Sequence, residues 1–304
     1  MKTVLDFPSR PLTWVVGFAN SGADLVTRMV AASVAWQLGQ PAVVENRPGA
    51  NALHAADHVA RAAPDGHTLF ASEQGALLLN ESAFAPVANI ARAALVLVAH
   101  PALQATNFAS FTAAARWAGV RLRFASPGAS LAHHIALQAL KARTGVDIVD
   151  VPYAGVMACM QALLAYQVHV GVFTSHYVLG HIASGRLTAI ASFSERRLPE
   201  LPAVPSLAEL GYAGMDIAPS LGVVVPRRTA PDIIMKLSAE VRRAVHDPKV
   251  GGKLRRLRLE PIGDTPELFA AFLRREARIW KPFLTAGPEQ GLAAMEGTQH
   301  WRSS

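Results

Sequence analysis

The sequence lacks the features that mark disulfide-bonded, membrane-spanning and disordered proteins. Among its 304 residues there is one cysteine, Cys159, so no disulfide can form within the chain, and the apolar run around it predicts a buried thiol. No apolar run reaches the ~18 residues needed to span a bilayer. Charged residues make up 17% and hydrophobic residues 51%, which excludes a disordered chain. Residues 1–14 have no apolar core of a secretory signal peptide, so the sequence by itself indicates a cytosolic chain or one that has lost its export signal.

Acidic residues are scarce as well. The chain has 22 Asp and Glu against 29 Lys and Arg, a formal net charge of +7 and an isoelectric point of about 10.0. A basic protein can bind nucleic acid if its cations cluster. The densest basic run is KLRRLRLE (253–260), in which three leucines are interleaved, so it indicates one exposed face at the end of a helix. We therefore expect no nucleic-acid partner, and a basic surface can instead attract carboxylates toward a cleft.

Motifs for nucleotide phosphates and for common catalytic sites are also missing. There is no G-x-G-x-x-G, no G-x-x-x-x-G-K-[ST] and no G-x-S-x-G nucleophile elbow. His54 and His58, with Asp57 between them, have the spacing of metal ligands on a helix, but no third ligand can be named. We therefore expect no metal, no cofactor and no catalytic residue. One enzyme alternative stays open, a hydrolase or transferase that uses Ser130 as nucleophile and His133 as base.

Strand-like and helix-like patterns alternate along almost the whole chain. Apolar β-type runs such as 11–18, 67–72 and 168–173 are followed by stretches with helical spacing. This alternation predicts an α/β fold in which mostly parallel sheets are flanked by helices. The length favours two sheets of about five strands each over one long sheet.

Two apolar strands, at 93–99 and 221–225, bracket the middle of the chain and are candidates for the crossings between two lobes. We therefore expect one domain built from residues 1–100 plus 221–304 and a second built from residues 101–220. The expected crossings lie near 97–101 and 218–223.

Four turns at expected strand ends combine glycines with polar residues: GFANSGAD (17–24), ASEQGA (71–76), FASPGASLAHH (124–134) and VPYAG (151–155). In doubly wound sheets, ligands bind beyond the carboxyl ends of the strands and against helix N-termini. Free N–H groups at those termini suit an anion. An ordinary capped helix explains each turn taken alone, but four such turns, two in each expected domain, favour a ligand site.

Two of these turns have the residues of a helix start. Ser21 can cap a helix, with Asp24 completing a capping-box-like pair, and Gly22 lets a ligand approach the backbone. In the third turn Ser130 is a natural N-cap and Gly128 lies at the tightest point.

Six segments follow one another in an order and spacing that resemble a known family: FPSRPLTWVVGFANSGAD, QPAVVENRPGA, AAPDGHTLFAS, FAPVANIARAALVLVAHP, VPYAGVMACMQALLAYQVHV and LPAVPSLAELGY. From about residue 7 to 285 the chain is similar to the Bug family of bacterial periplasmic solute-binding proteins, the receptors of tripartite tricarboxylate transporters. The resemblance implies a two-lobed periplasmic binding protein of the Venus-flytrap, type II-like kind. It also implies a periplasmic location, with the export signal absent from this chain, and a monomer.

The same resemblance implies a receptor and not an enzyme. Backbone amides of the loops 18–24 and 126–133 would hold a small carboxylate in the cleft between the lobes. The partner would be a membrane transporter or a sensor kinase, and transport and sensing stay open as alternatives. The residues implied at the site are Phe18, Ala19, Asn20, Ser21, Gly22, Asp24, Ser72, Gln74, Gly75, Ser126, Pro127, Gly128, Ala129, Ser130, His133, Tyr153, Ala154, Gly155, Phe173 and Thr174.

The chain departs from the family pattern in both loops. The family loops usually follow F-x-x-G-G-x-x-D and S-x-G-x-G-S-x-x-H, and each is one residue longer than the loop found here. Many members carry Asp at the positions of Phe173 and His169, and Glu73 adds a carboxylate to a ligand-facing turn. Because an aspartate is the natural partner of an α-amino group, its loss predicts a small, partly apolar or aromatic carboxylate as ligand and not an amino acid.

Overall fold

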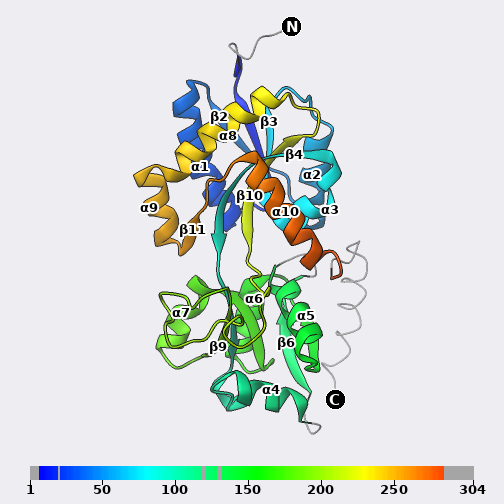
Figure 1. The fold of residues 1–304 in the computed structure, drawn as a ribbon, viewed down its shortest axis with the longest axis vertical. Coiled ribbons are helices and arrows are strands. Elements are labelled where there is room, and N and C mark those ends of the chain that lie inside the picture. Colours follow the sequence, from blue (N-terminus) through cyan, green and yellow to red (C-terminus); the bar gives the residue numbers. More distant parts are fainter. Residues whose placement is uncertain (1–6, 20, 118–120, 129–131, 284–304) are drawn as a thin grey trace. The chain divides into compact units, whose positions relative to one another are not determined.

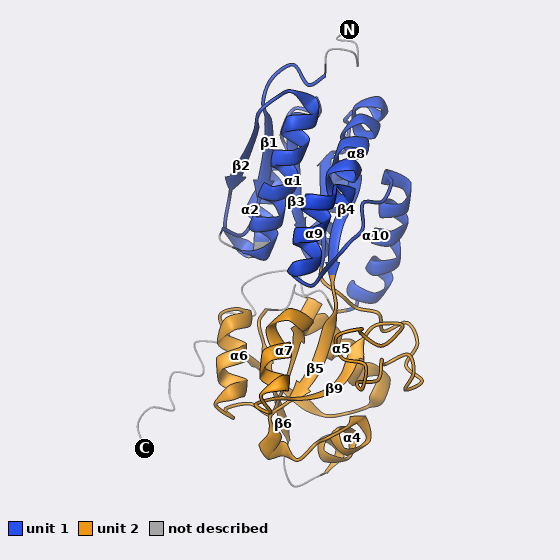
Figure 2. Ribbon diagram, turned by 90° about the vertical axis from the view of Figure 1, so that its left-hand side faces the viewer, with its two compact units in different colours: residues 1–92, 220–282 blue, residues 93–219, 283–304 orange. Residues whose placement is uncertain are grey.

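The computed structural model describes residues 7–19, 21–117, 121–128 and 132–283. The described residues fall into two compact units, one from residues 1–92 and 220–282 and one from residues 93–219 (Figure 2). The chain thus passes between the units at 92/93 and again at 219/220. The first passage precedes the whole of strand β5 (Leu95–Ala99), because both partners of β5 belong to the second unit.

The first unit contains a six-stranded mixed sheet (Figure 1). Its order is β11-β4-β10-β3-β1-β2. β1 is parallel to β2 and β3, whereas β10 is antiparallel to β3 and β4. Val16, the last residue of β1, pairs with Asn46 and Ala71, so β1, β2 and β3 end at the same edge of the sheet. The strands are β1 (Leu12–Val16), β2 (Ala42–Asn46), β3 (Thr68–Glu73), β4 (Phe84–Ala93), β10 (Ser220–Pro226) and β11 (Leu259–Pro261).

Helices cover both faces of this sheet. Side chains alternate across a strand, and apolar side chains on both faces pack against helices. Trp14 of β1 packs in one core with α1, α8 and α9, whereas its neighbour Val15 packs in another core with α2, α3 and α10. The helices are α1 (Gly22–Leu38), α2 (Leu53–Ala60), α3 (Gln74–Leu79), α8 (Pro231–His246), α9 (Pro248–Arg256) and α10 (Pro266–Trp280), with 3-10 turns at Ala50–Ala52 and Glu81–Ala83.

The second unit contains a five-stranded mixed sheet in the order β7-β6-β8-β5-β9. β6 is parallel to β7 and β8, and β5 is antiparallel to β8 and β9. The strands other than β5 are β6 (Leu122–Ser126), β7 (Ile148–Pro152), β8 (Val170–Thr174) and β9 (Thr188–Phe193), and the helices are α4 (Phe108–Arg116), α5 (Ala132–Thr144), α6 (Val156–Leu164) and α7 (Ser175–Ala183), with a 3-10 turn at Pro101–Leu103.

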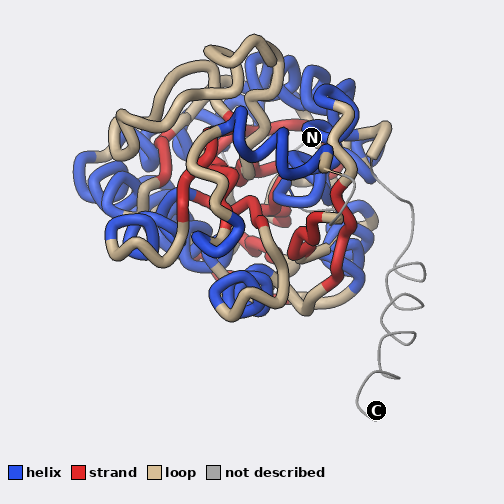
Figure 3. Tube along the Cα trace, turned by 90° about the horizontal axis from the view of Figure 1, so that it is seen from below, coloured by secondary structure: helices blue, strands red, loops and turns tan. Residues whose placement is uncertain are grey.

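The expected α/β fold with two lobes is confirmed. Strands lie toward the interior, with helices and loops around them (Figure 3). Each sheet is mixed, because the strand that follows each passage, β5 or β10, is inserted antiparallel to its neighbours. In the described part of the chain, no helix is long and apolar enough to cross a membrane.

Candidate functional site

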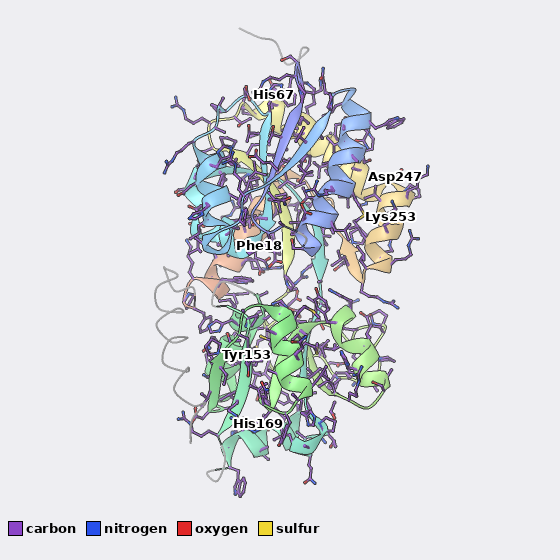
Figure 4. The ribbon with its side chains drawn as sticks, turned by 180° about the vertical axis from the view of Figure 1, so that it is seen from behind. Phe18, His67, Tyr153, His169, Asp247 and Lys253 are labelled. Atoms are coloured by element: carbon purple, nitrogen blue, oxygen red, sulfur yellow. The ribbon has the colours of Figure 1, made fainter. Side chains whose placement is uncertain are left out.

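The turn after β1 begins helix α1 as the sequence predicts. Ser21 has the extended backbone of an N-cap, and its Oγ accepts a hydrogen bond of 3.1 Å from the N–H of Asp24. The same hydroxyl donates to the carbonyl of Phe18 at 2.9 Å, which fixes the turn between strand and helix. The ring of Phe18, labelled in Figure 4, packs against the core of the α2 face. The Ser21 side chain is therefore occupied in building the turn.

The first two N–H groups of α1 have no partner in the described part of the chain. The N–H of Asp24 is bound to Ser21 Oγ and that of Leu25 to the Ser21 carbonyl, so those of Gly22 and Ala23 have no acceptor among the described residues. A Cβ built on Gly22 would meet no atom within 4 Å, so the space beside these groups is open. The positive end of a 17-residue helix dipole also lies here. This arrangement can bind an anion.

Asp24 was expected at the ligand, but its carboxylate is held inside the protein. It is 6% exposed and accepts from Arg28 Nε at 3.1 Å and from Asn46 Nδ2 at 2.7 Å. Arg28 also donates to Asn46 Oδ1 at 2.8 Å, which closes a three-residue network. Asn46 ends β2 beside the end of β1, so the network ties the start of α1 to the sheet. Asp24 therefore positions the turn.

Alanine substitutions at two glycines of this turn, Gly17 and Gly22, are expected to change the stability differently. A Cβ on Gly17 would lie 2.6 Å from the Cα of Ala52, a backbone atom that cannot move aside cheaply. We expect Gly17→Ala to lower the free energy of unfolding by about 1–3 kcal/mol. Gly22→Ala is expected to leave it unchanged or to raise it by up to ~1 kcal/mol, because alanine favours helix. Urea unfolding measures both, and equal effects of the two substitutions would contradict the close approach at Gly17.

Ser72 and Glu73 end β3, and Gln74 begins α3, at the same sheet edge as Asn46. Gln74 is 1% exposed, and its Oε1 accepts from the backbone N–H of Ser220 at 2.7 Å. It thus ties the end of β3 to the first residue of β10. Ser72 is buried opposite Gly222, and Gly75 is buried in the first turn of α3. The Oε1 of Gln74 is therefore engaged within the fold.

Glu73, which is half-buried between Ser72 and Gln74, is expected to make the stability of the protein depend on pH. Desolvation raises the pKa of its carboxyl from the ordinary 4.5 to about 7, and no charged group of the described chain opposes this. The folded state then binds more protons than the unfolded state between these values, so stability falls as pH rises through that window. Glu73→Gln is expected to match the wild type near pH 4 and to be the more stable protein near pH 8. Urea titrations across pH measure this, and parallel curves for the two proteins would refute it.

The turns after β6 and β7 are joined within the second unit. The N–H of Tyr153 donates to the carbonyl of Ser126 at 2.9 Å, and that of Gly155 to the carbonyl of Tyr153 at 2.8 Å. Gly128 has φ 137°, in the region that favours glycine, as the tight turn requires. Pro127 is buried and Ala154 exposed. The expected residues Asn20, Ala129 and Ser130 lie outside the described residues.

Phe173 and Thr174, the two residues of β8 expected at the ligand, lie on opposite faces of the sheet. The side chain of Phe173 is 1% exposed and packs in the core with Val178 and Leu163. Thr174, the next residue, ends the strand and has an unpartnered Oγ1. His169 lies near the other end of β8, where its Nδ1 accepts from the N–H of Arg123 at 2.9 Å. Its position therefore does not oppose the turn after β6.

His133 occupies the first turn of α5 and is 6% exposed. Neither of its ring nitrogens has a hydrogen-bond partner among the residues that the structure describes. Burial, with a smaller effect of nearby His176, lowers its pKa to about 4, so the ring is neutral at pH 7. Ser175, the residue after Thr174, is 1% exposed, and its Oγ has no hydrogen-bond partner among the described residues. Its one sequence signal was its place directly after the apolar strand β8.

The remaining expectations concern metal, thiol and charge. No group of three or more His, Cys, Asp or Glu that could hold a metal is found among the described residues. Cys159 is fully buried, which raises its pKa to about 12. The basic run lies on α9, where Lys253 (Figure 4) and Arg256 are exposed and Leu254 is buried. The expected exposed face at a helix end is therefore confirmed.

Known proteins resemble the chain over most of its length. Residues 26–286 match the family described as "Tripartite tricarboxylate transporter family receptor", TctC. The chain is 31% identical to protein BugT of Bordetella pertussis, over 90% of this chain and 88% of that protein. MatC from Rhodopseudomonas palustris with bound malate has a TM-score of 0.76 at 28% identity and covers 92% of this chain and 100% of its own.

A second protein of that organism, Rpa4515 with adipate, has a TM-score of 0.77 at 27% identity and covers 91% of this chain and 97% of its own. The matched residues begin within α1 and run through both units. The resemblance to the Bug proteins is thereby confirmed. The chain belongs to the tripartite tricarboxylate transporter receptor family, whose members are binding proteins and not enzymes.

Proposed function

We propose that the chain is a periplasmic solute-binding receptor that holds the carboxylate of a small organic acid through backbone N–H groups of two turns. The turn 18–24 supplies the N–H groups of the first unit, and the turn 126–133 supplies those of the second. The observation that carries the proposal is the open space beside the unpartnered N–H groups of Gly22 and Ala23. Relatives described as periplasmic, or holding malate or adipate, support it.

The binding energy of such a site is sufficient without a metal. A hydrogen bond to a charged group contributes about 1.5–3 kcal/mol. A micromolar ligand needs about 8 kcal/mol. Three or four amide contacts to one carboxylate, together with some burial of apolar ligand surface, reach that value.

The ligand class follows from the side chains near the turns. Asp24 is engaged with Arg28 and Asn46, and the Phe173 side chain lies in the core, so neither offers a carboxylate to an α-amino group. Glu73 is largely protonated below its raised pKa of about 7. The ligand proposed is therefore a small monocarboxylate that is partly apolar or aromatic.

The proposed receptor closes on its ligand about the two chain passages at 92/93 and 219/220. A ligand that contacts both units favours the closed state, because it binds that state more tightly. The closed receptor is then presented to a membrane transporter or a sensor partner.

Isothermal titration calorimetry with benzoate, adipate, malate, aspartate and glutamate tests the function, and native mass spectrometry of the freshly purified protein searches for a retained acid. We expect benzoate to bind more tightly than the two amino acids. Tight binding of aspartate and glutamate alone would overturn the ligand class. The absence of heat with every acid, together with no retained acid, would overturn the carboxylate receptor itself.

A further inference from the structure

We propose that the second unit carries an uncharged hydrogen-bonding subsite, formed by His133, Thr174 and Ser175, that receives a hydroxyl group of the ligand. The ligand class is thereby a hydroxylated monocarboxylate. This inference rests on the proposed function, because the carboxylate is held by the backbone turns and the subsite takes the second polar group.

The subsite consists of side chains that are buried and unpartnered. His133 is 6% exposed, Thr174 5% and Ser175 1%. Both ring nitrogens of His133 and both hydroxyl oxygens lack a hydrogen-bond partner in the described part of the chain. Burying polar groups without partners is unfavourable, so a set of them indicates partners that arrive with a ligand.

The topology brings the three residues to one edge of the sheet. β6 and β8 are parallel neighbours, so the segments that follow them leave from the same edge. Thr174 ends β8, Ser175 begins α7, and His133 lies in the first turn of α5 after β6. α5 also packs on β8, and the imidazole of His176 in α7 is close enough to affect the pKa of His133.

The neighbouring histidine shows that partners are available at this edge. His134 Nδ1 lies 2.9 Å from Ser126 Oγ and 3.7 Å from Asp150 Oδ2. Asp150 also accepts from Gln138 and lies 3.8 Å from Lys141 Nζ. His134 is thus built into a side-chain network, whereas His133, one residue earlier, is built into none.

The chemistry of the subsite selects the ligand group. Burial lowers the pKa of both His133 and His176, so both rings are neutral at pH 7, and no carboxylate or ammonium acts on His133. An ammonium or a second carboxylate of a ligand would therefore find no opposite charge. A hydroxyl can donate to an imidazole nitrogen and accept from Thr174 or Ser175, which suits it to this set.

The test compares acids that differ by one hydroxyl. Wild-type protein is titrated with benzoate against 3- and 4-hydroxybenzoate, and with butyrate against 3-hydroxybutyrate. We expect at least one hydroxylated acid to bind about 10-fold more tightly than its parent. The double variant Thr174→Val/Ser175→Ala and the variant His133→Phe are expected to reduce this ratio to within about 2-fold. Thr229→Val, which removes an equally buried and unpartnered hydroxyl in the first unit, should retain the ratio.

Thermal unfolding separates a ligand role from a structural one. If the hydroxyls wait for a ligand, Thr174→Val/Ser175→Ala leaves the melting temperature of the free protein unchanged or raises it. A ratio near one for every pair in the wild type, or an unchanged ratio in the variants, would overturn the subsite while binding of the parent acids leaves the receptor proposal standing. No binding of any of these acids, parent or hydroxylated, would overturn both.

Discussion

Gly22→Glu is expected to weaken carboxylate binding by about 100-fold or more, which corresponds to ~2.7 kcal/mol, and to leave the protein folded. The new side chain begins in open space, since a Cβ at this position meets no atom within 4 Å. Its carboxylate then competes for the free N–H groups at the start of α1 and repels an incoming anion. Calorimetry with the acid that the wild type binds most tightly in the panel measures the loss.

Gly22→Gln is the matched control, because glutamine has nearly the same shape without the charge. It is expected to cost ~10-fold or less, from partial obstruction of the turn alone. An acidic side chain in the first turn stabilises a helix by about 0.3–1 kcal/mol, so the Glu variant should melt no lower than the Gln variant. Equal affinities in the two variants, or wild-type affinity in the Glu variant, would rule out anion binding at α1.

Local signals predicted the elements that build the site. Ser21 and Asp24 predicted the start of α1, and the helix ends at Gly39, a C-cap glycine with φ 64°. Such signals act between residues close in sequence, so they can be recognised without coordinates. The position of the first ligand turn, directly after β1, follows from them.

Pairing between distant segments could not be predicted in the same way. β4 was missed, because inward and outward residues such as Val87, Ala88 and Ile90 are all buried and leave no alternation. Its partner β10 follows the whole second unit in the sequence, and its antiparallel pairing makes the sheet mixed. The hydrogen bond between Gln74 and Ser220 depends on the pairing of β10. The hydrogen bond between Asp24 and Asn46 depends on the β1–β2 register.

The candidate wall on β8 shows the limit of reasoning by motif. Phe173 and Thr174 were both expected to face a ligand, yet consecutive residues of a strand face opposite sides. The structure places the Phe173 ring in the core and leaves the Thr174 hydroxyl unpartnered. The alternation rule alone shows that the two side chains lie on opposite faces, but only the coordinates show which of them is in the core.

Asp24→Ala is expected to lower the free energy of unfolding by about 2–4 kcal/mol, because it removes a buried carboxylate that holds Arg28 and Asn46. Arg28→Met is the matched comparison and should cost less, about 1 kcal/mol, since the Arg28 side chain is 48% exposed. Urea unfolding measures both.

Ligand titrations of Asp24→Ala, Arg28→Met and Asn46→Ala separate a positioning role of Asp24 from direct contact with the ligand. If Asp24 only positions the turn, the carboxylate affinity of the folded Asp24→Ala protein falls in step with that of Arg28→Met and Asn46→Ala, because all three loosen one network. If Asp24 contacts a ligand cation, it alone loses affinity, and it loses most for aspartate and glutamate. A normal stability of Asp24→Ala would contradict the network as the feature that fixes α1 against β2.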